Sequence, residues 1–321
     1  MAKRVLVVGD IVLDHYIYVT SSRRAAEADI PVWDHELIEY RLGGAANVAN
    51  NLKSLGGQEI DVQLAGIAAR TGHTNHDRNF IAAAGIGTML VGGTETMYKH
   101  RYVDCNNKSR NIIFRADNFT RFDWKEVEEY ERFFCGFVGE VGTDADVVVV
   151  SDYDKGTVTP KIMESVFKMM KGRAVIVDSK RSDLSIFEGA QVLKLNELEA
   201  GAQVGNPKYI PMERLAPYVV VTKGAAGAEL RMYDPKLSRG RSYVVHTEQF
   251  GTETAEPVDV TGCGDTHTAA LAFSLLENSD VRRAVRFANA CATAAVRKFG
   301  TSAVYPRDVK GYDASDREED A

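Results

Sequence analysis

The stretch Asp146–Gly156, DVVVVSDYDKG, decides the fold class of this chain. Four consecutive valines follow Asp146, and such a continuous apolar run is typical of a strand buried on both faces of a parallel sheet. The run ends in a polar cluster that begins at Asp152. Open α/β sheets bind their ligands at the carboxyl ends of their strands. We therefore expect a ligand site directly after this strand.

Four further apolar runs end in polar clusters of the same kind. They are Arg4–Val8 before Gly9-Asp10, Ala174–Val177 before Asp178-Ser-Lys180, Val192–Leu195 before Asn196-Glu-Leu-Glu199, and Tyr218–Val221 before Thr222-Lys-Gly224. Helical patterns, such as Pro160–Lys171, lie between several of the runs. This alternation predicts an α/β fold with a doubly wound, mostly parallel sheet between helices.

Length and composition fit a single large domain. The chain has 321 residues, of which 45% are hydrophobic and 26% are charged, as in ordinary globular proteins. No internal repeat or low-complexity linker divides it, so we expect one domain over residues 1–312 and a disordered acidic tail over 313–321. The net charge of −6 provides no basic footprint for nucleic acid.

The cysteines and the N-terminus bear on the compartment. Four cysteines occur singly, without a Cys-x-x-Cys pair and without metal-ligand spacing to the histidines. Thiols in a reducing compartment are the expected interpretation. The chain begins with a strand-like segment rather than a signal-peptide pattern, and no apolar run reaches transmembrane length. These features predict a cytoplasmic protein without a membrane partner.

Two segments are predicted to leave the main sheet as a small lid. Tyr16–Tyr40 alternates in places and contains Pro31, which favours short, exposed strands. Met97–Asp117 has strand periodicity on both sides of a turn-rich centre. The two strand-like parts of this second segment carry the cations Lys99, Arg101, Arg110 and Arg115. A solvated edge strand explains such charges, and so does a site for an anionic group of the substrate.

The stretch Val258–Thr268, VDVTGCGDTHT, predicts an anion-binding turn. Gly262 and Gly264 precede a run of small and apolar residues that predicts a helix over Thr268–Leu276. Two glycines allow a sharp turn in which N–H groups converge at the helix N-terminus. Asp265, in the first turn, is either a helix cap or a general base beside a phosphate. Taken alone, the cap is the better interpretation.

A second glycine pair lies near the N-terminus. Gly43-Gly44 opens a predicted helix that Gly56 closes, with Asn47 and Asn51 one turn apart on one face. The glycines would let a ligand approach the backbone, but without further context a well-capped helix is the favoured interpretation.

Two early carboxylates stand near the end of the first predicted strand. Asp10 and Asp14 could accept hydroxyl protons from a polyhydroxylated ligand, or serve as a turn residue and a cap.

Together these motifs resemble those of the ribokinase (phosphofructokinase-B) family of carbohydrate kinases. The matching motifs are Gly43-Gly-Ala-Ala-Asn47, Asn196-x-x-Glu199, Thr222-Lys-Gly224 and Thr261-Gly-Cys-Gly-Asp265. They span nearly the whole chain in the order and spacing of the family. Within the family, the chain is most similar to bacterial D-glycero-β-D-manno-heptose 7-phosphate kinases. That likeness rests on Gly9–Asp14, Glu27–Val32, Ser151–Gly156, Asp178-Ser-Lys180, Phe287-Ala-Asn289 and Gly300-Thr-Ser302.

The resemblance implies a β lid that closes over the sugar and pairs between subunits, hence a homodimer. In many such kinases a nucleotidyltransferase domain follows on the same chain. Because this sequence stops before such a domain, we expect the kinase half alone. The implied activity is transfer of phosphate from ATP, with Mg²⁺, to a hydroxyl of a sugar phosphate. The implied acceptor is the anomeric hydroxyl of a heptose 7-phosphate, a precursor of ADP-heptose and lipopolysaccharide.

The resemblance also implies roles for individual residues. Asp265 would be the base, and the N–H groups of Gly262, Cys263 and Gly264 would stabilise the developing charge. Asn196 and Glu199 would organise Mg²⁺ through water. The nucleotide would contact Thr222, Lys223, Gly224, Gly227 and Asn289. The substrate would contact Asp10, Asp14, Gly43, Gly44, Asn47 and Asp152, with its phosphate held by Lys99, Arg101, Lys155 and Lys180, and Arg115 as a further candidate.

Other functions stay open at this point. The acceptor could instead be fructose, ribose or a nucleoside, or the chain could be a catalytically silent member that binds sugar or nucleotide. A dinucleotide-binding dehydrogenase is disfavoured because no Gly-x-Gly-x-x-Gly follows the first strand. The chain departs from the family pattern at Cys263, where alanine is usual, and at His267, where an apolar residue is common. His267 could lie against the nucleotide or the substrate, but we expect a helix-face residue without a catalytic role.

Overall fold

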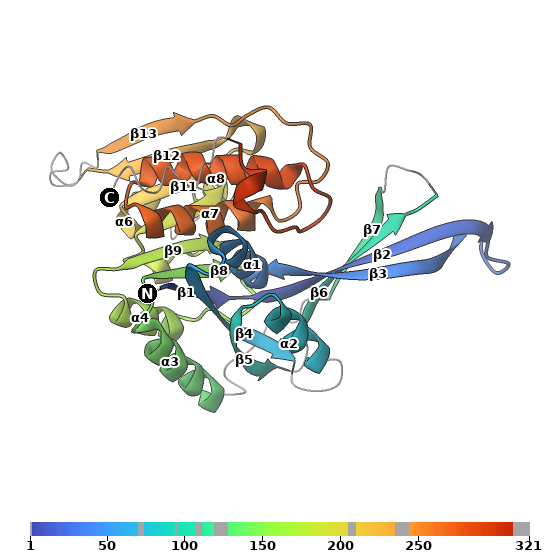
Figure 1. Ribbon diagram of the computed structural model, residues 1–321, viewed down its shortest axis with the longest axis horizontal. Coiled ribbons are helices and arrows are strands. Elements are labelled where there is room, and N and C mark those ends of the chain that lie inside the picture. The colour runs from blue at the N-terminus through green and yellow to red at the C-terminus, as the bar shows by residue number, and fades with distance from the viewer. Residues whose placement is uncertain are drawn as a thin grey trace.

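The computed structural model describes residues 2–69, 74–93, 96–106, 111–118, 128–204, 210–234 and 244–310. Within these ranges, a nine-stranded sheet lies between two layers of helices, and a four-stranded sheet projects from this body as a long arm (Figure 1). The predicted α/β fold with a small β lid is confirmed.

The large sheet is mostly parallel. Its order is β13 (Val245–Phe250), β12 (Ala228–Tyr233), β11 (Tyr218–Thr222), β10 (Val192–Asn196), β9 (Ala174–Ser179), β8 (Val147–Asp152), β1 (Lys3–Gly9), β4 (Ile60–Ala69) and β5 (Gly87–Gly93). The strands from β11 to β5 are parallel, and β12 and β13 continue the sheet in antiparallel fashion.

Successive residues of the parallel strands enter opposite hydrophobic cores. In β8, Val147 and Val149 pack into one core, whereas Val148 and Val150 pack into the other. Because both faces are buried, every position of such a strand is apolar, which explains the continuous valine run. The first core is covered by α1 (Ala45–Gly56), α2 (Thr74–Ala83), α7 (Cys263–Glu277) and α8 (Val281–Val296). The second is covered by α3 (Glu128–Gly142), α4 (Pro160–Met169), α5 (Glu197–Val204) and α6 (Met212–Leu215).

The strand order reverses at β1, which lies between β4 and β8. The chain therefore leaves the centre of the sheet in both directions, and such a switch point opens a crevice at the carboxyl ends of the strands. Close packing of β1 on β8 needs glycine at position 9, where a β-carbon would lie 1.9 Å from the Ser151 carbonyl oxygen. Both the Asp10 and the Tyr153 segments emerge at this point.

The lid has the strand order β3 (Pro31–Gly44), β2 (Ile11–Arg24), β6 (Met97–Asp104), β7 (Ile112–Asn118). The predicted short, exposed strands in Tyr16–Tyr40 are wrong in part, because β2 and β3 each have 14 residues. The base of β2 is also buried, since Tyr16 and Val19 are 0% exposed. Pro31 stands at the first position of β3, where its missing N–H costs no interior ladder bond.

Some connecting segments lie outside the described ranges. They include residues 235–243, between β12 and β13, and residues 119–127, which precede α3. The predicted acidic tail over 313–321 falls outside as well. The described residues also form three short 3₁₀ turns: Ser185–Phe187, Gly224–Ala226 and Pro306–Asp308. No helix in the described part has the length and apolar character needed to cross a membrane.

Candidate active site

The helix α7 begins with a turn that only glycine can form. Gly262 precedes the helix at φ 80°, in the left-handed region. A β-carbon at this position would also lie 2.9 Å from both Asn47 Nδ2 and Thr301 Cγ2. No side chain caps the helix, so its first N–H groups stay available to an anion. One of the three predicted donors is already engaged, because the Cys263 N–H donates to the Val260 carbonyl at 3.3 Å.

Asp265 lies in the first turn of α7 but does not cap it. Its Oδ2 atom accepts a hydrogen bond from Asn47 Nδ2 at 3.0 Å, and its Oδ1 atom accepts one from Tyr153 Oη at 2.6 Å. The interpretation of Asp265 as a helix cap is therefore wrong. Burial raises the pKa of Asp265, and the hydrogen bonds from Asn47 and Tyr153 oppose that rise. A carboxylate with a raised pKa is a stronger base than a solvated one.

The amide of Asn47 is oriented by its neighbour on α1. Asn51 Nδ2 donates to Asn47 Oδ1 at 3.0 Å, so the Asn47 oxygen faces Asn51 and its nitrogen faces Asp265. Asn51 is itself fixed, since its Oδ1 atom accepts the Val304 N–H at 3.0 Å. The one-turn spacing of the two asparagines thus places a donor at the carboxylate.

Two cavities meet at Asp265. The larger has a volume of about 580 Å³ and the smaller about 170 Å³. Four residues line both: Tyr153, Lys180, Gly264 and Asp265. The larger cavity contains most of the residues predicted for the nucleotide: Asn196, Glu199, Thr222, Gly224, Gly227 and Asn289. The smaller contains predicted substrate residues: Asp14, Gly44, Lys99 and Arg101. Such an arrangement can present two substrates to one carboxylate.

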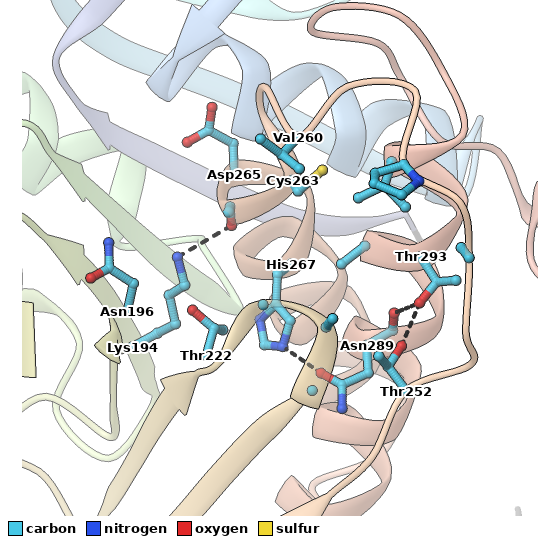
Figure 2. Close-up of a pocket in the computed structure, with 18 of the residues that line it drawn as sticks. Lys194, Asn196, Thr222, Thr252, Val260, Cys263, Asp265, His267, Asn289 and Thr293 are labelled. Atoms are coloured by element: carbon cyan, nitrogen blue, oxygen red, sulfur yellow. Dashed lines mark hydrogen bonds between the residues drawn. The ribbon is translucent and has the colours of Figure 1, made fainter. Parts of the chain in front are cut away.

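A buried ion pair that the sequence did not reveal stands beside the start of α7. Lys194 on β10 places its Nζ atom 2.9 Å from Asp178 Oδ2 and 3.4 Å from the Gly264 carbonyl. Burial acts against the charge, but Asp178 holds the pKa of Lys194 above its usual value. Figure 2 shows this side chain reaching across the larger cavity toward α7. A lysine inside an otherwise apolar strand run, Val192–Leu195, was the available signal.

His267 projects from α7 into the larger cavity, between Thr222 and Asn289 (Figure 2). Asn289 Nδ2 donates to the carbonyls of Phe250 and Gly251, so Asn289 Oδ1 must be the acceptor toward His267 Nε2, 3.2 Å away. The ring therefore carries its proton on Nε2. Burial lowers the pKa of His267 to about 3, so the ring is neutral and no proton donor at neutral pH.

Cys263 faces the same cavity. Burial, together with the charges of Asp259 and Asp265, raises the pKa of Cys263 to about 12. Its thiol therefore stays protonated and is a poor nucleophile.

The smaller cavity is lined by cations held at the base of the lid. Arg101 Nη1 lies 2.5 Å from Asp14 Oδ1, and both side chains are almost fully buried. Burial lowers the pKa of Lys99. The ammonium groups of Lys99 and Lys180 stand over the ring of Tyr153, with Nζ 5.0 Å and 3.6 Å from its centroid.

Comparison with known proteins identifies the family of this chain. Residues 2–308 match the pfkB family of carbohydrate kinases. The chain belongs to this family.

Relatives of this pfkB kinase include two curated proteins. It is 32% identical, over 95% of its length, to the bifunctional protein HldE of Geotalea uraniireducens. It is 34% identical, over 94% of its length, to the bifunctional protein HldE of Shewanella sediminis. The chain spans only 62% and 61% of the lengths of these two proteins.

Solved structures establish the fold of this pfkB kinase. Phosphofructokinase-2 from Escherichia coli, in complex with substrates and products, has a TM-score of 0.72 at 19% identity, covering 96% of this chain and 97% of that one. Ribokinase from Thermotoga maritima has a TM-score of 0.67 at 17% identity, covering 97% and 99%.

Some predicted substrate residues of the pfkB kinase lie outside both cavities. Asp10 accepts the backbone N–H groups of Tyr153, Lys155 and Thr157, at 2.7, 3.1 and 3.2 Å, so its carboxylate holds the loop after β8. Asp152 forms a salt bridge with Arg181, in which Arg181 Nε lies 2.5 Å from Asp152 Oδ2. Both aspartates therefore hold neighbouring parts of the chain in place and do not line a cavity themselves.

Four other predicted residues of the pfkB kinase are also displaced from the cavities. Gly43 makes room for Asp14, because a β-carbon there would lie 2.9 Å from Asp14 Oδ2. Lys223 Nζ binds Glu229 Oε2 at 2.5 Å, and the side chain of Lys155 lines neither cavity. Arg115 pairs with Asp117 on the exposed strand β7. Arg110 lies outside the described residues.

A magnesium ion fits this pfkB site only through water. Among the described residues, no three His, Cys, Asp or Glu side chains gather closely enough to hold a metal directly. Glu199 lines the larger cavity, and its Oε2 atom accepts the Asn196 N–H at 2.8 Å. Asn196 Oδ1 accepts the Glu199 N–H at the same distance, which fixes both side chains. Mg²⁺ usually keeps several waters and one or two carboxylate contacts, which a single fixed carboxylate beside nucleotide phosphates can provide.

Proposed function

We propose that this kinase transfers the γ-phosphate of ATP to a hydroxyl of a sugar phosphate. The observation that carries the proposal is the position of Asp265 on the wall shared by the two cavities. A nucleotide in the larger cavity and a sugar in the smaller would meet there. The cations Lys99, Arg101 and Lys180 line the smaller cavity, which favours an acceptor that already carries a negative group.

In the proposed transfer, Asp265 accepts the proton of the attacking hydroxyl. The hydroxyl oxygen forms a bond to the γ-phosphorus as the bond to the bridging oxygen breaks, and ADP leaves with that electron pair. Positioning and charge stabilisation carry most of the rate in phosphoryl transfer. The open N–H groups at the start of α7 and the ammonium of Lys194 are placed to stabilise the transferred group.

The nucleotide would occupy the larger cavity with its phosphates toward α7. Glu199 and Asn196, which line this cavity, would hold the waters of a bound Mg²⁺, and the ion would neutralise phosphate charge. Thr222, Gly224, Gly227 and Asn289 would line the nucleoside.

The acceptor we propose is the anomeric hydroxyl of a heptose 7-phosphate. The resemblance of Gly9–Asp14 and Ser151–Gly156 to heptose 7-phosphate kinases supports it, as does the identity with the HldE proteins over almost the whole chain. Another sugar phosphate stays the second candidate, since phosphofructokinase-2 of the same fold has been solved with fructose-6-phosphate.

Release of ADP across a panel of sugars tests the proposal. We expect turnover with heptose 7-phosphates, strong preference for phosphorylated over free sugars, and loss of that preference in Lys99→Met. Equal turnover of free and phosphorylated sugars would exclude the role of the cations. The absence of activity with every acceptor would favour a silent binding protein.

Asp265→Asn tests the base. General bases contribute roughly 10²- to 10⁴-fold, so transfer should fall by about that factor while ATP still binds. Asp144→Asn, an exposed carboxylate paired with Arg4, is the matched control and should keep full activity. Near-normal turnover in Asp265→Asn would refute the assignment.

We also propose a homodimer formed through the lid. Exposed apolar side chains gather on its strands: Leu37, Ile38, Tyr40, Ile112, Ile113 and Phe114. Edge strands with such residues favour pairing with another chain.

A further inference from the structure

Tyr153 is the residue of the site whose position the proposed transfer does not explain. Its hydroxyl donates to Asp265 Oδ1 at 2.6 Å, and its side chain forms part of the wall between the two cavities. Asn47 engages the other oxygen of the same carboxylate. With Asp265 only 5% exposed, a hydroxyl that enters from the smaller cavity must compete with the phenol for Oδ1.

The backbone around Tyr153 is fixed, so any movement must come from the side chain. The N–H groups of Tyr153 and Lys155 both donate to Asp10 Oδ2, at 2.7 and 3.1 Å. Asp154, the next residue, has φ 56°, and among the described residues it is the one non-glycine in the left-handed region. Backbone in this region persists only where its surroundings enforce it.

The ring of Tyr153 is held by the cations that we assign to the acceptor. Lys180 Nζ lies 3.6 Å and Lys99 Nζ lies 5.0 Å from the ring centroid. A cation near a ring face is attracted by the negative charge of the ring's π-electrons. An acceptor phosphate offers these ammonium groups a stronger partner, because charged hydrogen bonds exceed cation–π attraction. An anion in the smaller cavity would thus weaken the hold on the ring.

We propose that Tyr153 is a positioning residue that occupies the acceptor position on Asp265 until an anionic acceptor draws Lys99 and Lys180 from its ring. The inference rests on the proposed function of the site. With the phenol in place, water cannot readily use Asp265 as its base. The enzyme would thereby restrain hydrolysis of ATP while no acceptor is bound.

The restrained side reaction is simple hydrolysis. The oxygen of water would bond to the γ-phosphorus, its proton would pass to Asp265, and ADP would leave with the electron pair of the broken bond. The Tyr153 hydrogen bond blocks Oδ1 and also weakens Asp265 as a base, because a donor to a carboxylate stabilises its charged form.

Tyr153→Phe tests the inference, since it removes the hydroxyl and keeps the ring. We expect ATP hydrolysis without acceptor to rise roughly tenfold, the effect of losing one hydrogen bond to a charged group, and transfer to persist. Tyr18→Phe is the matched control, because its hydroxyl bonds Glu39 in the lid, 3.1 Å away, and it should hydrolyse ATP as the wild type does. Unchanged hydrolysis in Tyr153→Phe, or hydrolysis and transfer that fall together, would overturn the inference.

Inorganic phosphate provides a second readout that a structural role would not move. We expect added phosphate to raise ATP hydrolysis by the wild type toward the level of Tyr153→Phe, and to leave the variant unchanged. Equal responses of the two proteins would contradict the mechanism.

Measurements of hydrolysis and of transfer distinguish a failure of the inference about Tyr153 from a failure of the proposed function. Hydrolysis is measured without any acceptor, so it does not depend on the identity of the sugar. A wild type that transfers phosphate while Tyr153→Phe shows no excess hydrolysis would refute only the role of Tyr153. A wild type that phosphorylates no sugar, with Tyr153→Phe still hydrolysing faster, would refute only the proposed acceptor. Absence of hydrolysis in both proteins would refute the role of Tyr153.

Discussion

His267 shows how burial changes the chemistry of a single side chain. Its pKa is about 3 in the folded protein, because burial excludes the charged form, and about 6.5 in an unfolded chain. Between these values the unfolded chain binds a proton that the folded protein does not. Stability is therefore lost as the pH falls from about 6.5 toward 3, by about 1.4 kcal/mol per pH unit from this residue.

We predict that the free energy of unfolding depends less steeply on pH in His267→Leu, because unfolding of the variant takes up about one proton fewer. The free energy of unfolding, measured in urea between about pH 6 and pH 4, should fall less steeply in the variant. His246→Gln, which removes an exposed histidine from β13, is the control for loss of any imidazole. Identical slopes in wild type and His267→Leu would show that His267 takes up its proton in the folded state.

Lys194 carries a second prediction at the residue scale. In Lys194→Met, the carboxylate of Asp178 would stay buried without its cation, and removal of one partner from a buried pair costs about 3–5 kcal/mol. Denaturation in urea measures the loss. Lys310→Met breaks a pair with Glu253 in which the two side chains are 70% and 56% exposed, so that change should cost at most about 1 kcal/mol. Equal losses in the two variants would mean that Asp178 finds another partner.

The start of α7 is the structural element that combines strain with function. Gly262→Ala would place a β-carbon in the left-handed region and against Asn47 and Thr301. We expect the variant to lose about 1–2 kcal/mol of stability from the backbone alone. Phosphate transfer should fall by more than the loss of stability explains, because the added β-carbon would push Asn47 away from Asp265. Thermal unfolding and ADP release measure the two effects.

Gly201→Ala is the matched control for this element. Position 201 lies within α5, and a β-carbon there would meet nothing within 4 Å. Alanine in a helix is favoured over glycine by up to about 1 kcal/mol, so this variant should be as stable as the wild type or more so. If Gly262→Ala behaved in the same way, the turn would not need its left-handed geometry.

The assembly of the whole molecule gives the last prediction. Phe114 and Leu37 are 60% and 55% exposed on the lid, and we expect them to be covered in a dimer. A double Phe114→Glu and Leu37→Glu variant should sediment as a monomer where the wild type sediments as a dimer, because two carboxylates would have to be desolvated in the interface. Phe133→Glu, on α3 and 62% exposed, should leave the state of assembly unchanged. A wild-type monomer would refute the dimer.

Much of the fold could be predicted because its signals are local. The apolar run of β8 and its polar end are contiguous in the chain, and so is the glycine turn at Gly262. The length of β2 and β3 could not be predicted in the same way. Tyr16 and Tyr18 of β2 pack against Val103 of β6 and against Phe299, which both lie far away in the sequence.

The same division runs through the candidate site. The sequence indicated Asp265, Asn47 and the nucleotide residues, because their motifs are short and ordered. It could not separate Asp265, which faces two cavities, from Asp10, whose oxygens accept three backbone N–H groups. The sequence around an aspartate does not show whether its carboxylate faces a cavity or binds backbone N–H groups. Only its partners in the folded structure distinguish the two roles.

The sequence by itself determined the parallel α/β architecture and the kinase family, and it indicated Asp265 as the base that we propose, since periodicity, turns and ordered motifs are properties of the chain. Only the tertiary structure decided that Tyr153 bonds Asp265, that Lys194 is neutralised by Asp178, and that Asp10 and Asp152 support the site without facing it. These contacts join residues from different strands and helices. Their energies depend on burial and on distances of a few ångströms, which are fixed only when the sheet and its two helical layers have packed together.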